Sequence, residues 1–240
     1  MSTTNSVKKV TITAVVVGAL CSGMFGALPA SATTTTQDQT ALREWFTSQG
    51  VQSATQDALI AKLDSGSLLD SMSQSVEPTS TTSVQTATEL VSRSVYPDGS
   101  VAVTSLEKPA VTAGGAKAGS RSLQPQQITG CKESNGGGYV VESNCKVEIA
   151  TGPYDLWFNA TYERYTGGAQ IDTANKANAV VKYGNLVAAP TVTIKRKKQD
   201  GSLEAYAQEH ALYKSTSLGS SEDLYVSLRV TTSRAWTTNY

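Results

Sequence analysis

The sequence has little of what most catalytic centres need. Its single histidine, His210, excludes histidine-rich zinc sites and leaves a Ser-His-Asp triad with one possible base. It contains no G-x-S-x-G elbow, no H-E-x-x-H motif and no P-loop. The composition therefore favours a protein with no metal, no cofactor and no enzymatic activity.

The chain also has no formal net charge at pH 7. The chain carries 20 Lys and Arg against 20 Asp and Glu. Removal of residues 1–32 would take away Lys8 and Lys9 and no acidic residue, which leaves 18 against 20. A balance of this kind creates no global field for attracting nucleic acid or an acidic membrane, so we expect no nucleic-acid partner.

The first 32 residues have the three parts of a secretory signal peptide in order. Lys8 and Lys9 precede an apolar stretch over residues 10–28, and residues 29–32 read Pro-Ala-Ser-Ala. We expect cleavage after Ala32, with Ala30 as the alternative, and therefore a secreted protein that keeps no transmembrane anchor. Cys21 lies inside the apolar stretch, which argues against a lipoprotein.

Two cysteines follow the signal segment, Cys131 and Cys145. In an oxidising compartment such a pair predicts a disulfide. A Gly-rich turn lies between them at residues 135–138, so the bond would close a hairpin. Their spacing is far from C-x-x-C, which disfavours a redox pair.

Residues 33–107 predict a small N-terminal region. One helix is expected over residues 39–48 and another from Ser53, where Ser53 and Gln56 have the spacing of a capping box. Residues 73–88 read as a linker because they are rich in Ser and Thr and lack a period. A β-hairpin follows, with its turn at Pro97-Asp98-Gly99.

Residues 108–127 are rich in Gly, Ala and Ser and predict a flexible linker. After it, residues 128–240 alternate in hydrophobicity and predict seven or eight short strands joined by turns. The clearest is 154–165, where every second residue is apolar: Leu156, Phe158, Ala160 and Tyr162. We expect a mostly β protein whose C-terminal domain is an antiparallel β-sandwich, Ig-like or jelly-roll-like, with a helical hairpin and a β-hairpin before it.

Two N-terminal stretches, QDALIAKLDSGSLLDSM over residues 56–72 and YPDGSVAVTSLEKP over residues 96–109, carry a resemblance. The chain resembles here a group of secreted actinobacterial proteins of unassigned function, although Leu68-Leu69 stands where that group has a Trp. The resemblance covers about a third of the exported chain. It implies a bacterial extracellular protein and assigns no catalytic residue.

Two features suggest binding. Trp157, together with Trp236, Tyr154, Tyr165 and Tyr240, would stack on sugar rings if exposed, and the same residues equally suit strands and cores. The basic run Lys195, Arg196, Lys197 and Lys198 would either contact an anionic polymer or protect a strand end from pairing.

The sequence therefore predicts a secreted, non-enzymatic protein of the cell envelope that binds a cell-wall polymer or glycan. One alternative is an antimicrobial or toxin-like effector whose basic run meets a membrane. A third is a β-sandwich glycosidase that uses Asp155 and Glu163, which lie on one face of a predicted strand.

Overall fold

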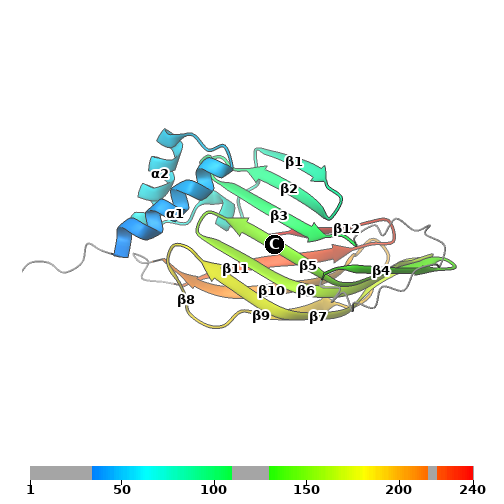
Figure 1. The fold of residues 1–240 in the computed structure, drawn as a ribbon. Coiled ribbons are helices and arrows are strands. Elements are labelled where there is room, and N and C mark those ends of the chain that lie inside the picture. Colours follow the sequence, from blue (N-terminus) through cyan, green and yellow to red (C-terminus); the bar gives the residue numbers. More distant parts are fainter. Residues whose placement is uncertain (1–33, 110–129, 216–220, 240) are drawn as a thin grey trace, which may run out of the picture.

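The structure is a computed structural model, and it describes residues 34–109, 130–215 and 221–239. The expected signal peptide and nearly all of the expected linker at 108–127 lie outside these residues. Within them the protein is mostly β, with two antiparallel sheets stacked as a sandwich and two helices at one end (Figure 1). No helix in the described part of the chain has the length and apolar character to cross a membrane.

Sheet A contains seven strands in the order β1-β2-β3-β5-β6-β7, with β4 also paired to β5. Because β3 and β4 pair with different halves of β5, they lie end to end along one edge of it. The strands are β1 (Ser80–Gln85), β2 (Glu89–Val95), β3 (Val101–Glu107), β4 (Lys132–Gly136), β5 (Tyr139–Thr151), β6 (Tyr154–Tyr165) and β7 (Gly168–Val181).

Sheet B contains five strands in the order β12-β11-β10-β8, with β9 also paired to β10. Its inner face is apolar through alternate residues of β10 and β11, as expected of a strand with one buried face. The strands are β8 (Asn185–Leu186), β9 (Thr191–Arg196), β10 (Ala205–Lys214), β11 (Glu222–Val230) and β12 (Ala235–Thr238).

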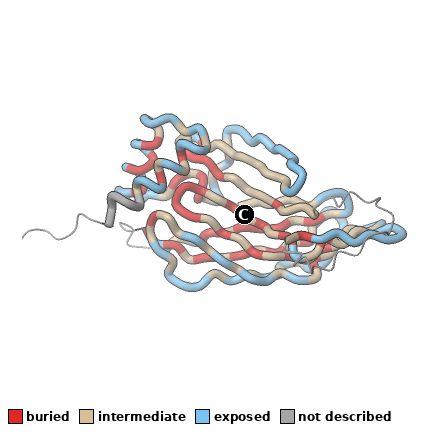
Figure 2. The backbone as a smooth tube through the Cα atoms, in the orientation of Figure 1, coloured by how far each residue is buried: buried red, intermediate tan, exposed pale blue. Residues whose placement is uncertain are grey.

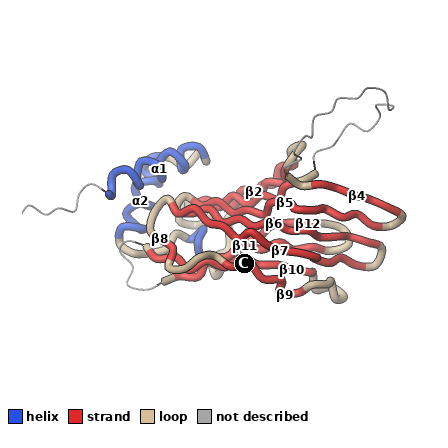
Figure 3. Tube along the Cα trace, turned by 60° about the horizontal axis from the view of Figure 1, so that its bottom comes forward, coloured by secondary structure: helices blue, strands red, loops and turns tan. Residues whose placement is uncertain are grey.

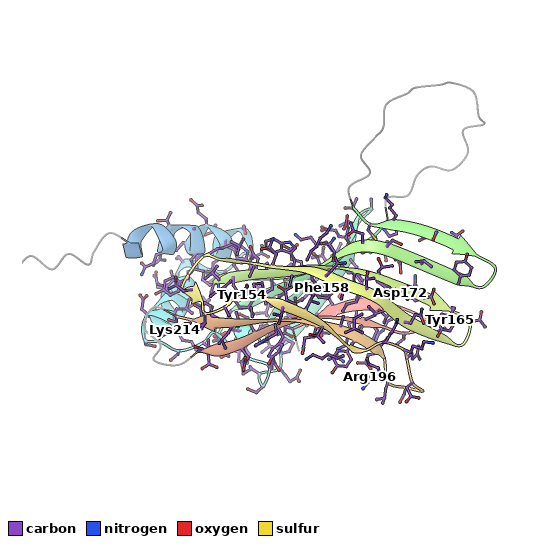
Figure 4. All side chains as sticks on the ribbon, turned by 90° about the horizontal axis from the view of Figure 1, so that it is seen from below. Tyr154, Phe158, Tyr165, Asp172, Arg196 and Lys214 are labelled. Atoms are coloured by element: carbon purple, nitrogen blue, oxygen red, sulfur yellow. A yellow bond between two sulfur atoms is a disulfide. The ribbon has the colours of Figure 1, made fainter. Side chains whose placement is uncertain are left out.

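Strand β6 has the alternation that the sequence predicted. Leu156, Phe158, Ala160 and Tyr162 are all buried between the sheets, and the intervening residues face outward. Figure 4 shows Tyr154, Phe158 and Tyr165 along this strand, and Figure 2 shows the buried backbone concentrated where the two sheets face each other. The main core therefore lies between the β5–β6 region and the β10–β11 pair.

The hairpin formed by β2 and β3 belongs to the same sheet as the strands that follow residue 128. Strand β3 pairs with β5 from Ala102↔Thr151 to Leu106↔Val147. The expected linker at 108–127 thus lies between β3 and β4, two strands of one sheet that both pair with β5. Residues 73–88, expected to be a linker, contain β1, which the absence of apolar alternation in Ser80–Gln85 concealed.

The helices α1 (Thr34–Ser48) and α2 (Ser53–Asp64) cap the end of the sandwich that carries the β2–β3 and β5–β6 turns, and the β4–β5 hairpin projects at the other end (Figure 3). A 3-10 turn, η1 (Asp70–Met72), follows. The predicted capping box is wrong: α2 is capped at Gln52 without a side-chain hydrogen bond. Gln56 is buried, and its Nε2 instead donates to Thr47 Oγ1 and to the Val51 carbonyl, which joins the two helices.

A cluster of charges fastens α2 to the β2–β3 turn. Lys62 Nζ lies 2.7 Å from Asp70 Oδ1 and 2.9 Å from Asp98 Oδ2. Burial opposes ionisation of Asp98, but hydrogen bonds from Ser100, from the Asp70 amide and from Lys62 together hold the pKa of Asp98 below its usual value. The helices and the hairpin are therefore held as one unit.

Cys131 and Cys145 form a disulfide at the base of the β4–β5 hairpin, with 4.1 Å between their Cα atoms. Replacing both cysteines by serine should lower the free energy of unfolding by about 3 kcal/mol, because the cross-link restricts a short loop in the unfolded chain. Urea denaturation measures this loss, and reduction of the unaltered protein should reproduce it. Equal stability of the oxidised and reduced forms would contradict the prediction.

Candidate functional site

A groove of about 260 Å³ lies between strands β1 to β3 of sheet A and strand β12 of sheet B. The segment before β1 forms one of its walls. Its lining is polar and rich in hydroxyl groups, and Glu77 is the one charged residue among the described residues that line it. The hydroxyl groups come from Ser73, Thr81, Ser92, Ser94, Tyr96, Thr104, Thr237 and Thr238.

The register of sheet A explains why the groove is polar. On one row of the inner face, Ile149 of β5 lies beside Thr104 of β3, which lies beside Ser92 of β2, which lies beside Ser83 of β1. The inner face is therefore apolar where sheet B covers it and becomes hydroxyl-lined toward the free edge. Polar side chains are favoured there because water reaches them.

Hydroxyl pairs fix the floor of the groove. The Oγ atoms of Thr81 and Ser94 are 2.9 Å apart, and those of Ser83 and Ser92 are 2.8 Å apart. The hydroxyl of Thr104 makes no hydrogen bond within the described part of the chain. Since a hydroxyl both donates and accepts, this surface can match the hydroxyl groups of a ligand in either role.

The opposite wall is held by two hydrogen bonds from the C-terminal strand. Thr237 Oγ1 donates to the Ser105 carbonyl at 3.1 Å, and Asn239 Nδ2 donates to the Tyr96 hydroxyl at 3.1 Å. The other side of the sandwich is closed by backbone bonds from Ile171 to Lys197 and from Gln199 to Ala169. The sandwich therefore opens toward β1 and is closed at β7.

The basic run predicted as a binding feature lies at the end of β9. Arg196 is engaged within the protein: its Nη1 donates to the Glu204 carbonyl at 2.9 Å, and its guanidinium lies 5.4 Å from the centre of the Tyr206 ring. Lys195, Lys197 and Lys198 are exposed and have no ion-pair partner among the described residues. They can contact solution ions or polymers, but they lie away from the groove lining.

Trp157 does not join the basic run. It is half-buried on the outer face of sheet A, and the ammonium group of Lys146 lies 5.0 Å from its ring centre. Strand β7 pairs with β6 and separates it from the segment that carries the lysines. The structure places these two predicted binding features at different positions.

The other aromatic candidates have mixed outcomes. Of the two alternatives for Tyr154, sugar stacking and core packing, the structure shows the second: Tyr154 is 1% exposed, because the helical end of the sandwich covers the β5–β6 turn. Trp236 belongs to the strand that bounds the groove, and the guanidinium of Arg234 lies 4.4 Å from its ring centre. Tyr165 is half-buried at the end away from the helices, and Tyr240 lies outside the described residues.

The two carboxylates considered for glycoside hydrolysis are far apart. Asp155 and Glu163 are eight residues apart on one strand, so about 26 Å separates their positions, whereas a glycosidase pair needs about 5 to 10 Å. Asp155 is instead bound to Lys182 at 2.7 Å, although burial raises the pKa of Asp155 above its usual value. These two side chains do not form a catalytic pair.

His210 lies on the outer face of sheet B. Its Nε2 is 2.6 Å from Asp223 Oδ1, and its ring stacks on Tyr225 with 5.0 Å between centres. In the described part of the chain no serine or cysteine is hydrogen-bonded to this histidine. The same part of the chain contains no group of three or more His, Cys, Asp and Glu that could hold a metal ion.

A buried carboxyl group lies inside the sandwich, away from the groove. Glu209 of β10 is fully buried, and burial raises its pKa to about 9. Its Oε1 accepts a hydrogen bond from the Asn178 amide at 3.1 Å, and its Oε2 has no partner among the described residues. Asn178 follows a bulge in β7 at Lys176, where φ is 56°, and this bulge frees the amide from the sheet ladder.

Comparison of the chain with protein-family models, curated proteins and solved structures finds no match.

Proposed function

We propose that this chain is a secreted, non-enzymatic protein that binds a neutral glycan of the bacterial envelope in the groove between β1–β3 and β12. The observation that carries the proposal is the row from Ile149 through Thr104 and Ser92 to Ser83, along which the inner face of sheet A changes from apolar to hydroxyl-lined. The groove is polar and has one charged residue in its described lining, which suits a ligand with many hydroxyl groups.

Two observations support a role outside the cell. The first 32 residues predict export, and the disulfide between Cys131 and Cys145 is of the kind that persists in an oxidising compartment. The resemblance of residues 56–72 and 96–109 to secreted actinobacterial proteins supports the bacterial envelope as the place of action. The nature of the ligand rests on the groove alone.

Replacing Thr104 by valine should weaken glycan binding. The change keeps the shape of the side chain and removes a floor hydroxyl that makes no hydrogen bond to the described residues, so we expect a loss of about 1 kcal/mol, or about fivefold in Kd. The probe is a neutral oligosaccharide retained by the protein in a screen of bacterial cell-wall fragments. Isothermal titration calorimetry measures its Kd.

The matched control is Thr193→Val, the same change at an exposed threonine of β9 outside the groove. The Thr193→Val variant should bind the oligosaccharide with the same Kd as the unaltered protein. The proposal fails if no neutral glycan is retained, or if the two valine variants bind equally well.

A second candidate is contact with an anionic polymer such as teichoic acid, favoured by the exposed Lys195, Lys197 and Lys198, which form no ion pair with the residues that the structure describes. The two candidates differ in their response to salt. Binding through the lysines should weaken steeply between 50 and 500 mM NaCl and be lost when all three are replaced by glutamine. Binding in the groove should change little under either treatment.

A further inference from the structure

Strand β1 is a free sheet edge without the usual protection. Edges are commonly blunted by charged residues, proline, bulges or short length, because unpaired backbone groups invite another strand. Strand β1 is six residues long, reads STTSVQ, is exposed throughout and pairs with β2 without a register shift. It contains no charged residue and no proline.

The other edges in the described part of the chain are protected. Strand β7 contains two register shifts and is bonded at its start to residues 197–199. Strand β9 has a register shift and ends in Lys195 and Arg196, strand β12 has four residues, and β4 carries Lys132 and Glu133. Among these edges, β1 is the one that is both long and uncharged.

The hydrogen-bond phase shows which backbone groups face outward. The amide of Thr86 donates to the Glu89 carbonyl, so this pair is hydrogen-bonded. Since such pairs alternate along an antiparallel ladder, Ser80, Thr82 and Val84 bond to β2. The amides and carbonyls of Thr81, Ser83 and Gln85 therefore point to the open edge.

We propose that a second copy of this chain pairs antiparallel with β1 about a twofold axis that is perpendicular to sheet A and passes midway between the Ser83 residues of the two copies. This register places Ser83 opposite Ser83 of the second copy, and Thr81 opposite its Gln85. All three outward-facing residues of each copy then form hydrogen-bonded pairs.

Like charges on opposing residues would destabilise a pair of identical strands. Strand β1 has no charged residue, so self-pairing brings no like charges together. It also covers Val84, which is 61% exposed and is the most exposed large apolar side chain in the described part of the chain. A twofold interface must be self-complementary, and an uncharged strand of Ser, Thr, Val and Gln meets that condition. Figures 1 and 2 show β1 along a margin of the molecule that neither the helices nor sheet B cover.

The pairing also has a consequence for binding, which rests on the proposed function. An axis perpendicular to the sheet keeps the inner faces of both copies on one side. Because each groove opens toward β1, the two grooves face each other across the paired strands. A glycan polymer can then occupy both grooves at once, while a short oligosaccharide occupies one.

Sedimentation equilibrium without ligand tests the pairing itself. One strand pair buries less than the roughly 1,200 Å² of stable complexes, so we expect reversible dimers that form between about 10 µM and 1 mM. Ser83→Pro removes an outward amide and the hydroxyl bond to Ser92, and it keeps the backbone bonds to β2. Val84→Lys adds a charge on each copy beside the axis. Both variants should weaken dimerisation at least tenfold.

The control is Val187→Lys, the same change at a valine that is 50% exposed and lies outside β1. It should dimerise as the unaltered protein does. A monomer at all concentrations, irregular aggregates without a dimer, or dimers that persist in both β1 variants would overturn the proposal.

Titration of the same proteins with glycan separates the two proposals. A polymer should bind the unaltered protein at least tenfold tighter than it binds Val84→Lys, whose side chain lies outside the groove lining, and a short oligosaccharide should bind both equally. If no glycan binds at all, the proposed function fails and the dimer stands on the sedimentation result. If the polymer shows no preference although dimers form, the two grooves do not face each other across the paired strands.

Discussion

Replacing Glu209 by glutamine should stabilise the folded protein at neutral pH by about 3 kcal/mol and have almost no effect near pH 4. The carboxyl group is fully buried, and its pKa is raised from an ordinary value of 4.5 to about 9. In the folded protein it stays protonated up to that pH, whereas in the unfolded chain it ionises from about pH 4.5 upward. Glutamine is uncharged in both states.

The sign follows from the protons bound in each state. Between pH 4.5 and pH 9 the unfolded chain loses a proton that the folded chain keeps, so the stability falls by about 1.4 kcal/mol for each pH unit from this group alone. Glutamine can still accept the bond from the Asn178 amide through its oxygen. The residues paired with Glu209 on either side, Val192 and Val226, are apolar and supply no compensating charge.

Urea denaturation from pH 4 to pH 9 measures the effect. The control is Glu133→Gln on the exposed strand β4, which should stay within about 0.5 kcal/mol of the unaltered protein. A difference between Glu209→Gln and the unaltered protein that does not grow with pH would contradict the burial of an uncharged carboxyl. A loss of stability at neutral pH would contradict it as well.

Replacing Phe46 by alanine should lower the free energy of unfolding by about 3 to 5 kcal/mol. Phe46 is fully buried where α1 meets the β5–β6 turn. The contact is close: a Cβ atom at Gly152 would lie 2.8 Å from Phe46 ring atoms and 2.6 Å from Leu42 Cδ1. Truncation leaves a cavity between the helices and the sandwich that the rigid turn cannot fill.

Denaturation monitored by tryptophan fluorescence measures this loss, because Trp45 lies next to Phe46 with 5.5 Å between ring centres. Gly152→Ala should also destabilise the protein, since its methyl group would force the same contact apart. Glu44→Ala, on the exposed side of α1, should change the stability by no more than about 0.5 kcal/mol. A loss below 1 kcal/mol in Phe46→Ala would show that the helices are not docked as described.

The strands were predictable where the side chains alternate without interruption. Strand β6 follows from its sequence because each second residue is apolar from Leu156 to Tyr162. Strands β5 and β7 are not predictable as single strands, since bulges at Asn144 and Lys176 insert a residue and reverse the alternation. The alternation of a single strand does not reveal an inserted residue, because a bulge is defined by the pairing with the partner strand.

The groove could not be predicted from local pattern. Its floor includes β1, in which polar residues occupy both faces and no alternation exists. Its opposite wall comes from Thr237 and Asn239, which only the folded chain brings next to β3 and Tyr96. The burial of Glu209 was not predictable for a related reason. Glu209 lies on the same face of β10 as Ala205, Ala207 and Ala211, and alanines mark a buried face only weakly in a sequence.

Binding of a neutral glycan in the groove between β1–β3 and β12 can be tested directly. Titration of isotope-labelled protein with the retained oligosaccharide, followed by amide chemical shifts, tests it residue by residue. We expect the largest shifts at Thr81, Ser92, Thr104 and Thr237, with Lys197 and Lys198 unchanged. Shifts confined to residues 195–198, or spread over the outer face around Trp157, would contradict the account.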